Sequence, residues 1–257
     1  MSRIFITGST DGLGLAAAQT LIDAGHEVIL HARSADRAAA VANVAARAGG
    51  MVLGDLASAA EVRGIADQVN ALGRMDAVIH NAGVYHLPSR GATPEGHAAT
   101  LAINTLAPYL LTALIERPRR LIYLSSGLHR GGSGSLADID WTARQWDPAR
   151  AYAESKLHDA ALAALVARRW PDVLSHAVDP GWVRTKMGGP SAPVDLATGQ
   201  DTQTWLAITD DPAALTTGGY WARRQRQDPA PEVTDPAFQD RLAVKLAELT
   251  GVALFGA

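Results

Sequence analysis

The chain has 257 residues, 47% of them hydrophobic and 19% charged, which is enough to bury a sizeable core and excludes disordered and fibrous architectures. Its 23 basic and 26 acidic residues give a net charge of −3, so no nucleic-acid or membrane partner is expected. The absence of cysteine excludes disulfide scaffolds and thiolate chemistry. With no signal peptide or membrane-spanning run, we expect a cytoplasmic protein.

Short apolar runs alternate with alanine-rich helical stretches, a pattern typical of βαβ units around a parallel sheet. In chain order we expect strands at 3–7, 27–31, 51–54, 76–80, 119–125 and 173–178, with an edge strand at 218–221. Helices are expected at 13–24, 35–48, 58–72, 95–115, 148–170, 196–209 and 236–249, and Pro108 should kink or break the fourth. No repeat or linker divides the chain, so residues 1–257 are predicted to form a single α/β domain.

A glycine-rich turn, Thr7-Gly8-Ser9-Thr10-Asp11-Gly12-Leu13-Gly14, joins the first strand to the first helix. Glycines at such a turn allow positive φ and let the backbone approach a pyrophosphate at the helix N-terminus. The spacing departs from G-x-G-x-x-G, so an ordinary tight turn between strand and helix stays open as an alternative.

Arg33 follows the second strand, where NAD-binding folds often carry an acid that binds the ribose 2′-hydroxyl. An arginine here can instead bind a 2′-phosphate, which predicts NADP(H) as the preferred cofactor and NAD(H) as an alternative. Asp11 occupies a position in the glycine-rich turn where a basic residue would help to bind the 2′-phosphate. Arg33 would therefore determine the preference for NADP(H) nearly alone. The alternative is an arginine at a strand end, neutralised by Asp36.

Tyr152 and Lys156 lie four residues apart in a predicted helix, so both side chains share one face. A cation within about 4–6 Å favours a phenolate, and we expect Lys156 to lower the Tyr152 pKa by about 2–3 units. The hydroxyls of Ser125 and Ser126 end the fifth strand and could polarise a substrate oxygen. A surface Tyr–Lys pair and a serine cap are the alternatives.

These motifs, in this order, resemble the short-chain dehydrogenase/reductase family over nearly the whole chain. His80-Asn81-Ala82-Gly83 is similar to its N-N-A-G element, with His80 replacing an asparagine beside the cofactor, and Pro180 to Thr185 is similar to its P-G-x-V-x-T loop. The gap of 26 residues between Ser126 and Tyr152 is similar to the retinol-dehydrogenase-like branch. The resemblance implies a Rossmann-type doubly wound parallel sheet, with substrate loops around 127–147 and 185–217.

The resemblance also implies roles for individual residues. The implied catalytic residues are Ser126, Tyr152, Lys156 and Asn104, with Asn104 holding a water next to Lys156. The implied cofactor-binding residues are Gly8, Ser9, Thr10, Gly12, Leu13, Gly14, Arg33, Asp55, Leu56, Asn81, Ala82, Gly83, Tyr152, Lys156, Pro180, Gly181, Val183 and Thr185.

Other residues are assigned by their place in the pattern. The eight histidines lack the spacing of a metal site, so no metal is predicted. Four residues on loops at the carboxyl side of the sheet could line a substrate pocket: His86, His129, Trp182 and Met187. Trp141 and Trp146 could anchor their loop.

The alanine-rich face of 152–168 suggests a homodimer or homotetramer, or else packing on the chain's own sheet.

We therefore expect an NADP(H)-dependent oxidoreductase that transfers hydride between nicotinamide and a carbonyl or alcohol of a small, apolar substrate. The alternative from another class is a catalytically silent NADP-binding regulatory or scaffold protein of the same fold. A nucleotide-sugar epimerase or dehydratase would need a larger region after Thr185 than this chain has.

Overall fold

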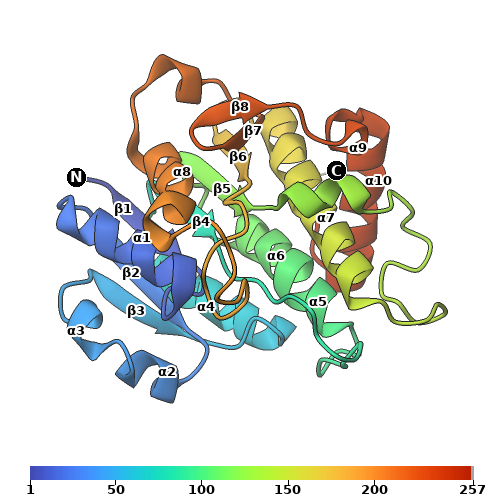
Figure 1. Ribbon diagram of the computed structural model, residues 1–257, viewed down its shortest axis with the longest axis horizontal. Helices are drawn as coiled ribbons and strands as arrows, with labels where there is room; N and C mark the ends of the chain where they lie inside the picture. The colour runs from blue at the N-terminus through green and yellow to red at the C-terminus, as the bar shows by residue number, and fades with distance from the viewer. Residues whose placement is uncertain (256–257) are drawn as a thin grey trace.

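A mostly parallel sheet of eight strands runs through the centre of the computed structural model, which describes residues 1–255 (Figure 1). Its strands are β1 (Arg3–Ile6), β2 (Glu27–Ala32), β3 (Gly50–Leu53), β4 (Ala77–His80), β5 (Arg120–Leu124), β6 (Leu174–Val178), β7 (Gly219–Ala222) and β8 (Gln225–Gln227). The strand order is β3-β2-β1-β4-β5-β6-β7-β8, with β8 antiparallel to β7 and the other neighbours parallel. This order confirms the Rossmann-type doubly wound fold, and it reverses between β1 and β4, where such sheets bind ligands.

Helices cover both faces of the sheet (Figure 1). The helices are α1 (Gly12–Asp23), α2 (Ala35–Ala39), α3 (Ala42–Ala45), α4 (Ala59–Ala71), α5 (Ala99–Leu101), α6 (Ala107–Leu114), α7 (Pro148–Arg169), α8 (Leu196–Ile208), α9 (Pro231–Thr234) and α10 (Pro236–Thr250). They are joined by a π-helical segment, η1 (Ala102–Leu106), and by the 3₁₀ segments η2 (Gly127–Gly131) and η3 (Pro212–Leu215). Alternate residues of β1 point to opposite faces: Ile4 and Ile6 enter the core beneath α1 and α8, whereas Phe5 enters the larger core beneath α4, α6 and α7.

Two predicted helices differ from the structure. The helix expected at 35–48 is interrupted between α2 and α3, where Val41 leaves helical geometry with φ −123°. The helix expected at 95–115 begins at Ala99, so its predicted start is wrong. The interruption expected at Pro108 is confirmed, because this residue lacks the N–H that would donate back to the preceding turn, and the π-helical η1 ends immediately before α6.

The C-terminal edge of the sheet was incompletely predicted. β7 is not the edge strand, because β8 pairs with it in a hairpin that joins Ala222 to Gln225. The two residues of this turn, Arg223 and Arg224, have positive φ values of 51° and 57°. Such turns usually carry Asn or Gly, so two arginines gave no turn signal from which to predict the hairpin.

Helix α7 is buried within its own chain rather than exposed for subunit pairing. Of its 22 residues, most are buried, and α9 and α10 pack on its outer side (Figure 1). The alanine-rich stripe therefore packs intramolecularly, which was the second of the two expectations for it. Among residues 1–255, no helix is both long and apolar enough to cross a membrane.

Buried histidines make the fold sensitive to acid. Burial lowers the pKa of His80 to about 3 and the pKa values of His158 and His176 to about 4. At pH 5 these side chains are neutral in the folded chain, whereas an unfolded histidine with a pKa near 6.5 is protonated. Burial raises the pKa of Asp159 to about 6, so at pH 5 the folded state binds one proton at Asp159. This proton offsets one of the three that the unfolded state binds at the histidines.

Because the unfolded state then binds more protons, we expect the free energy of unfolding to fall by at least about 2.7 kcal/mol between pH 5.5 and pH 4.5. Urea unfolding at the two pH values measures this difference. In the variant His158→Leu the difference should shrink by about 1.4 kcal/mol, the share of one proton. Equal stability of the wild-type chain at both pH values would contradict the neutral burial of these histidines.

Candidate active site

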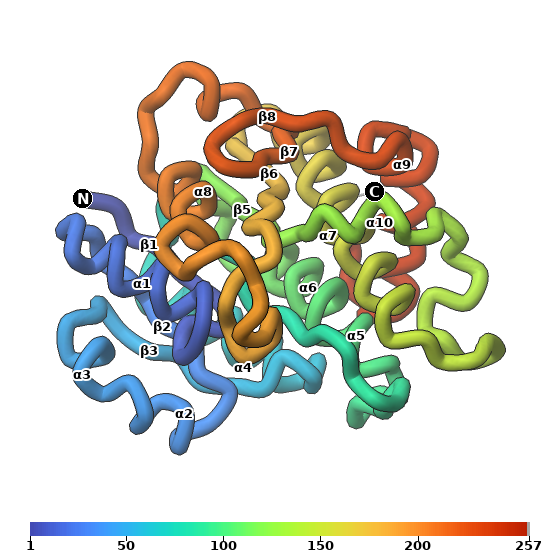
Figure 2. Tube along the Cα trace, viewed as in Figure 1, coloured from blue at the N-terminus to red at the C-terminus, as the bar shows by residue number. Residues whose placement is uncertain are grey.

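A cleft of about 1000 Å³ lies along the carboxyl edge of the sheet, at the reversal between β1 and β4. The loop after β6 closes over it: in Figure 2 this orange segment passes beside the blue turn that leads into α1. Lys186 on the loop contacts Asp11 on the turn, although the two residues are 175 positions apart in the chain. Most predicted site residues line this cleft: Gly8, Thr10, Gly12, Leu13, Gly14, Arg33, Asp55, Leu56, Asn81, Ala82, Gly83, Ser126, Tyr152, Lys156, Pro180, Gly181, Val183 and Thr185.

The glycine-rich turn brings its backbone close to the cleft. Gly8 and Gly12 have positive φ values of 65° and 51°, which residues with side chains rarely adopt. A Cβ atom on Gly14 would lie 2.4 Å from Asn81 Nδ2 and 2.5 Å from the Gly8 carbonyl oxygen, so only glycine fits there. The N-terminus of α1 therefore reaches the cleft wall, where its unpaired N–H groups suit a pyrophosphate.

Gly14→Ala should therefore damage the turn. We expect a loss of about 1–3 kcal/mol in the free energy of unfolding, from the forced contact, together with weaker NADPH binding. Gly64→Ala in α4 is the matched control, because a Cβ atom there meets nothing within 4 Å, and alanine should stabilise the helix by about 0.5–1 kcal/mol. Chemical unfolding and NADPH fluorescence measure both variants, and equal effects of the two substitutions would contradict the close packing of Gly14.

Hydrogen bonds join the strand ends beneath the cleft. Thr7 Oγ1 accepts from the backbone N–H groups of Asn81 and Ala82 at 3.0 Å, and Asn81 Nδ2 donates to the Thr7 carbonyl at 3.0 Å. His31, which sequence analysis missed, accepts from the Gly8 N–H at Nδ1, at 2.9 Å. Its Nε2 lies 2.9 Å from the Gly54 carbonyl, so a neutral His31 with its proton on Nε2 fixes the turn.

Three residues singled out from the sequence do not line the cleft: the predicted site residues Ser9 and Asn104, and His80, which replaces an asparagine of the family motif. Ser9 is fully buried, and its Oγ accepts from the His31 N–H at 2.8 Å, so it supports the turn from below. Asn104 is also fully buried in η1. His80 is buried beside Thr112 and Tyr123, away from the residues that line the cleft.

Basic side chains gather at the adenosine end predicted for the cleft. Arg33 is exposed and has no hydrogen-bond or ion-pair partner within residues 1–255, so the alternative of a pair with Asp36 is wrong. Arg37 and Lys186 lie 3.2 and 2.7 Å from Asp11 Oδ2, and the hydrogen bond from Lys186 is the main cause of a lowered Asp11 pKa. Folding therefore brings two more cations to the wall that carries Arg33, and both are paired with Asp11.

Tyr152 and Lys156 line the other end of the cleft from successive turns of α7. Lys156 Nζ lies 5.8 Å from the centroid of the Tyr152 ring, and the ring of Tyr85 packs against Tyr152 with centroids 4.5 Å apart. Ser126 follows the end of β5, and its Oγ accepts from the Leu128 N–H at 3.2 Å. With this acceptor bond made, the Ser126 hydroxyl keeps its proton for donation into the cleft.

The Tyr152 phenol is neutral in this structure. Burial raises its pKa above the usual 10, whereas the charge of Lys156 and the hydroxyl of Ser126 lower it. The carboxylates of Asp159 and Asp179 add to the increase. The expected net lowering of the Tyr152 pKa is therefore wrong here because burial outweighs Lys156, although Lys156 acts in the expected direction. A neutral phenol is a proton donor.

Asn104 connects the π-helical segment to the loop after β4 and to α7. Its Oδ1 accepts from the Val84 N–H at 2.8 Å, while Nδ2 donates to the Val84 carbonyl at 3.0 Å and to Ser155 Oγ at 2.9 Å. These bonds use both amide N–H groups and one acceptor site, so a single lone pair of Oδ1 is left for the predicted water.

Apolar and aromatic side chains rim the end of the cleft that carries Tyr152: Tyr85, Leu128, Trp182 and Met187. Three of them are unusually exposed for their type, with 51% of Leu128, 57% of Trp182 and 47% of Met187 accessible. Exposed apolar groups of this size, gathered around one opening, are typical of a binding site for an apolar ligand. The carboxylate of Asp179, at the end of β6, lies in the same wall.

Trp182 and Met187 thus line the cleft as expected, whereas the two histidines do not. His129 is fully buried, with Nε2 accepting from the Ala230 N–H at 2.9 Å and its ring 4.6 Å from that of Tyr220. His86 is exposed, with φ 59°, and its ring packs on Tyr85 outside the cleft lining. Their expected place in the pocket is wrong, because η2 turns His129 inward.

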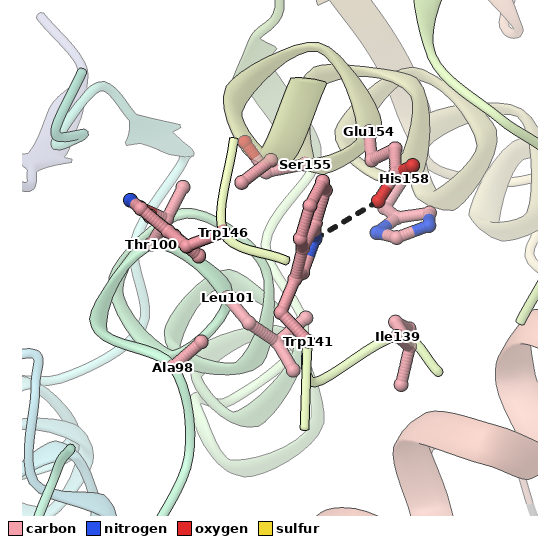
Figure 3. A pocket seen from close by; sticks show the side chains of 10 residues that line it. Ala98, Thr100, Leu101, Ile139, Trp141, Trp146, Glu154, Ser155 and His158 are labelled. Atoms are coloured by element: carbon pink, nitrogen blue, oxygen red, sulfur yellow. Dashed lines mark hydrogen bonds between the residues drawn. The ribbon is translucent and has the colours of Figure 1, made fainter. Parts of the chain in front are cut away.

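The long loop between β5 and α7 is anchored by its tryptophans, as expected. Trp141 Nε1 donates to Glu154 Oε2 at 3.1 Å (Figure 3), and Arg144 donates to both Glu154 oxygens at 2.8 and 2.6 Å. Trp146 Nε1 donates to the Leu87 carbonyl at 3.0 Å. Glu154 points away from the cleft, on the opposite side of α7 from Tyr152, so these contacts fix the loop outside the site.

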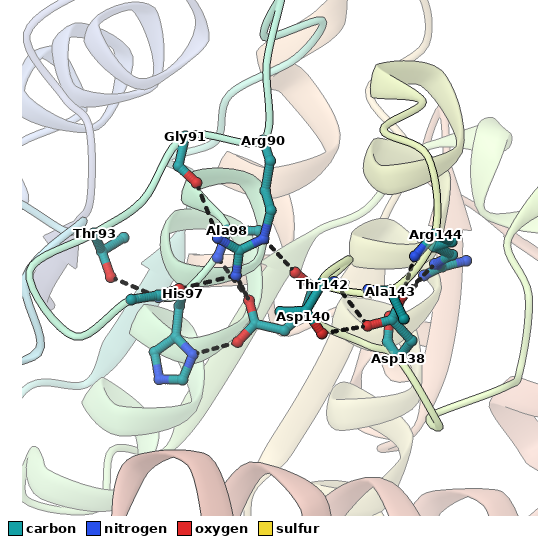
Figure 4. A network of polar contacts seen from close by, with 11 residues as sticks. Arg90, Gly91, Thr93, His97, Ala98, Asp138, Asp140, Thr142, Ala143 and Arg144 are labelled. Carbon is teal, nitrogen blue, oxygen red and sulfur yellow. Dashed lines mark hydrogen bonds and ion pairs between the residues drawn. The ribbon is translucent and has the colours of Figure 1, made fainter.

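A second polar cluster ties this loop to the segment before α5 (Figure 4). Asp140 accepts from Arg90 Nη2 at 3.1 Å and lies 2.6 Å from His97 Nδ1. Its Oδ1 also accepts from the Ala98 N–H at 2.6 Å. The loops at the rim of the cleft are therefore held at their bases by charged side chains, of which Glu154 is buried and Asp140 is partly buried.

Comparison with known proteins identifies the family. Residues 2–193 match the family model of short chain dehydrogenases. The chain belongs to the short-chain dehydrogenase/reductase family. As a member, it is an oxidoreductase that acts on carbonyl or CH–OH groups. Its mostly parallel, doubly wound sheet is the fold expected from that resemblance.

Several short-chain dehydrogenases resemble the chain over nearly its full length. Short-chain dehydrogenase chyC of Penicillium rubens is 40% identical over 257 residues, covering 99% of each chain. A Streptomyces protein named for daunorubicin C-13 ketoreduction, DnrU, is 35% identical over 270 residues, covering 98% of this chain and 92% of its own. Retinol dehydrogenase 13 of Homo sapiens is 29% identical over 287 residues, covering 97% and 84%, which supports the predicted branch.

Solved structures share the fold. An uncharacterised protein from Mycobacterium paratuberculosis superposes with a TM-score of 0.85 at 24% identity, covering 100% of this chain and 96% of its own. A blue fluorescent protein from a metagenomic library, solved in complex with NADPH, has a TM-score of 0.70 at 21% identity, covering 86% and 95%.

Folding also brings residues into this short-chain dehydrogenase cleft that sequence analysis did not assign. They are His31, Arg37, Val84, Tyr85, Ile103, Leu124, Gly127, Leu128, Asp179, Lys186 and Gly188. Two of them had a usable signal, since Arg37 lies four residues after Arg33 and Lys186 directly follows the predicted nicotinamide loop. The apolar ones lie in loops whose course no local pattern predicts.

Proposed function

We propose that this chain is an NADPH-dependent carbonyl reductase that acts on an apolar, aromatic ketone or aldehyde. One observation carries the proposal: a neutral Tyr152 phenol stands with Lys156 and Ser126 at one end of a cleft whose other end presents a glycine-rich turn and Arg33. An extended ligand with an anionic middle and a reactive ring at the tyrosine end fits this arrangement.

The residues along the cleft fit a bound NADPH. The α1 N-terminus would hold the pyrophosphate, and Arg33 would hold the 2′-phosphate with help from Arg37. Val183 and Thr185 would contact the nicotinamide carboxamide. When bound, the nicotinamide supplies hydride to the carbonyl carbon.

The chain's own side chains would manage the oxygen and its proton. The Ser126 hydroxyl donates a hydrogen bond to the carbonyl oxygen, and Tyr152 Oη gives its proton to the same oxygen as negative charge develops there. The Lys156 ammonium stabilises the phenolate that is left. Burial keeps the phenol protonated at neutral pH, which is the form that carbonyl reduction requires.

The rim of the cleft supports the substrate class. Tyr85 and Trp182 offer faces for a flat ring, while Leu128 and Met187 add apolar contact. The Asp179 carboxylate makes the same wall unfavourable for acids, so a neutral or amine-bearing substrate fits better than a carboxylate. The ketoreductase name of one relative agrees with a ketone substrate.

Purified protein assayed for NADPH oxidation against a panel of ketones, aldehydes and quinones tests the proposal. We expect turnover that is faster with aromatic than with short aliphatic carbonyls, and faster with neutral than with carboxylated analogues. Saturable NADPH binding without turnover of any compound would instead favour the silent NADP-binding protein.

A cytoplasmic homo-oligomer is also part of the proposal, and analytical ultracentrifugation tests the assembly. Because α10 covers α7, an oligomer would have to form through other elements of this chain.

A further inference from the structure

Asp159, which sequence analysis did not single out, pairs with Lys156 inside the protein. Asp159 Oδ2 accepts a hydrogen bond from Lys156 Nζ at 2.8 Å, and the two side chains are only 3% and 5% exposed. Both residues lie on α7, three positions apart, so one helical turn brings them together. A buried carboxylate in direct contact with this lysine is not part of the mechanism described above.

The geometry fixes the position of the ammonium group. Lys156 Nζ also donates to the Leu124 carbonyl at the end of β5, at 2.7 Å. An ammonium has three N–H donors, so two are held by the interior of the protein and one is left for the cleft that Lys156 lines. Asp159 and Leu124 thereby orient the third N–H group of Lys156 toward the cleft.

Lys156 is the one cation paired with Asp159 in the part of the chain that the structure describes. Within residues 1–255, Asp159 forms no other ion pair, and its second oxygen, Oδ1, is buried without a hydrogen-bond partner. The other titratable groups that face the pair are the phenols of Tyr123 on β5 and Tyr152 on α7, with the Asp179 carboxylate beyond Tyr152 at the end of β6. None of these is a cation that could replace Lys156.

A lysine this deeply buried needs such a partner. Burial by itself lowers the pKa of an ammonium and can leave it neutral near physiological pH. At Lys156 burial acts in that direction, but the charge of Asp159, its hydrogen bond and the neighbouring Tyr152 together outweigh burial, and the net pKa lies above the usual 10.5. A neutral amine would not stabilise a developing phenolate at Tyr152.

We propose that Asp159 is a positioning residue that keeps Lys156 charged and holds its ammonium group in place next to Tyr152. Its role in turnover rests on the carbonyl reductase function proposed above, whereas its effect on Lys156 does not. The cost of this arrangement is that the Asp159 charge also opposes formation of the Tyr152 phenolate. The Tyr152–Lys156 couple therefore keeps both of its protons to high pH.

Lysine titration tests the first part of the proposal without any activity assay. The chain has three lysines, Lys156, Lys186 and Lys245, so NMR of protein labelled at lysine ¹³Cε follows each of them. In Asp159→Asn, which keeps the size of the side chain, we expect the Lys156 pKa to fall by at least about one unit, as removal of an adjacent opposite charge predicts. An unchanged Lys156 pKa would overturn the proposal.

The wild-type chain provides a test that does not depend on folding of the variant. Its Lys156 is expected to stay charged to above pH 10, and titration below about pH 9 would contradict the stabilisation by Asp159. Asp140→Asn is the matched control, because it removes a partly buried carboxylate from the cluster with Arg90 and His97, away from the cleft. Lys156 should titrate identically in this control and in the wild type.

Kinetics then test the positioning role. Loss of the first proton from the Tyr152–Lys156 couple ends reduction at high pH, and Asp159 favours the fully protonated form. In Asp159→Asn the alkaline limb of kcat/KM for ketone reduction should move at least about one unit lower, while Asp140→Asn leaves it in place. A limb that stays in place while activity falls uniformly would mean that Asp159 is merely structural. A wild-type protein without reductase activity would refute the proposed function, and the lysine titration would still decide the role of Asp159.

Discussion

Tyr152→Phe is expected to lower kcat for ketone reduction by ~10³-fold or more, because the substitution removes the group that transfers its proton to the reacting oxygen in the proposed mechanism. NADPH binding should persist within about fivefold, since the glycine-rich turn and the basic wall are unchanged and one neutral hydrogen bond contributes about 1 kcal/mol. Steady-state rates of NADPH oxidation and fluorescence titration with NADPH measure the two quantities separately.

Tyr220→Phe is the matched control for this substitution. Tyr220 is buried, its hydroxyl has no hydrogen-bond partner within residues 1–255, and it lies outside the cleft lining. Removing this hydroxyl should leave kcat unchanged within about twofold, because an unpaired buried polar group contributes nothing that its loss would remove. A Tyr152→Phe enzyme with more than about a tenth of wild-type kcat would refute Tyr152 as the acid.

Arg33→Ala is expected to lower kcat/KM for NADPH by ~10²-fold and to leave kcat/KM for NADH nearly unchanged. Arg33 is exposed in the cleft wall without a partner of its own, so its guanidinium is available for a 2′-phosphate. Hydrogen bonds to charged groups contribute about 1.5–3 kcal/mol, which corresponds to about 10–150-fold in binding. The ratio of the two kcat/KM values is the quantity to measure.

Two further variants separate Arg33 from its neighbours. Arg37→Ala should lower kcat/KM for NADPH less than Arg33→Ala does, because Arg37 is partly neutralised by its ion pair with Asp11. Arg150→Ala removes an exposed arginine that does not line the cleft, and it should leave kcat/KM unchanged for both NADPH and NADH. If Arg33→Ala lowered kcat/KM for NADPH and for NADH equally, Arg33 would not bind the 2′-phosphate.

The fold and the core of the site could be predicted from sequence because both depend on local patterns. The strand, glycine turn and helix at Arg3 to Asp23 follow from a short apolar run, three glycines and an amphipathic stretch. The Tyr152–Lys156 contact follows from helical spacing alone. Each of these features depends only on residues that are close together in the sequence.

Features that depend on distant contacts or on burial could not be predicted. Lys186 reaches Asp11 across 175 positions, and no local pattern encodes that approach. The net pKa of Tyr152 depends on how deeply α7 is buried, which spacing does not determine. Asp159 is an intermediate case: its position three residues after Lys156 was visible, but only its burial distinguishes it from a surface acid on the same helix.

The pH dependence of kcat/KM for NADPH-dependent ketone reduction tests most directly whether a neutral Tyr152 donates the proton. The structure predicts a plateau from about pH 6 to 9 and a single decline above it, as the buried phenol with its raised pKa ionises. A rate that instead rises through neutral pH, as it would if phenolate were the active form, would contradict the account.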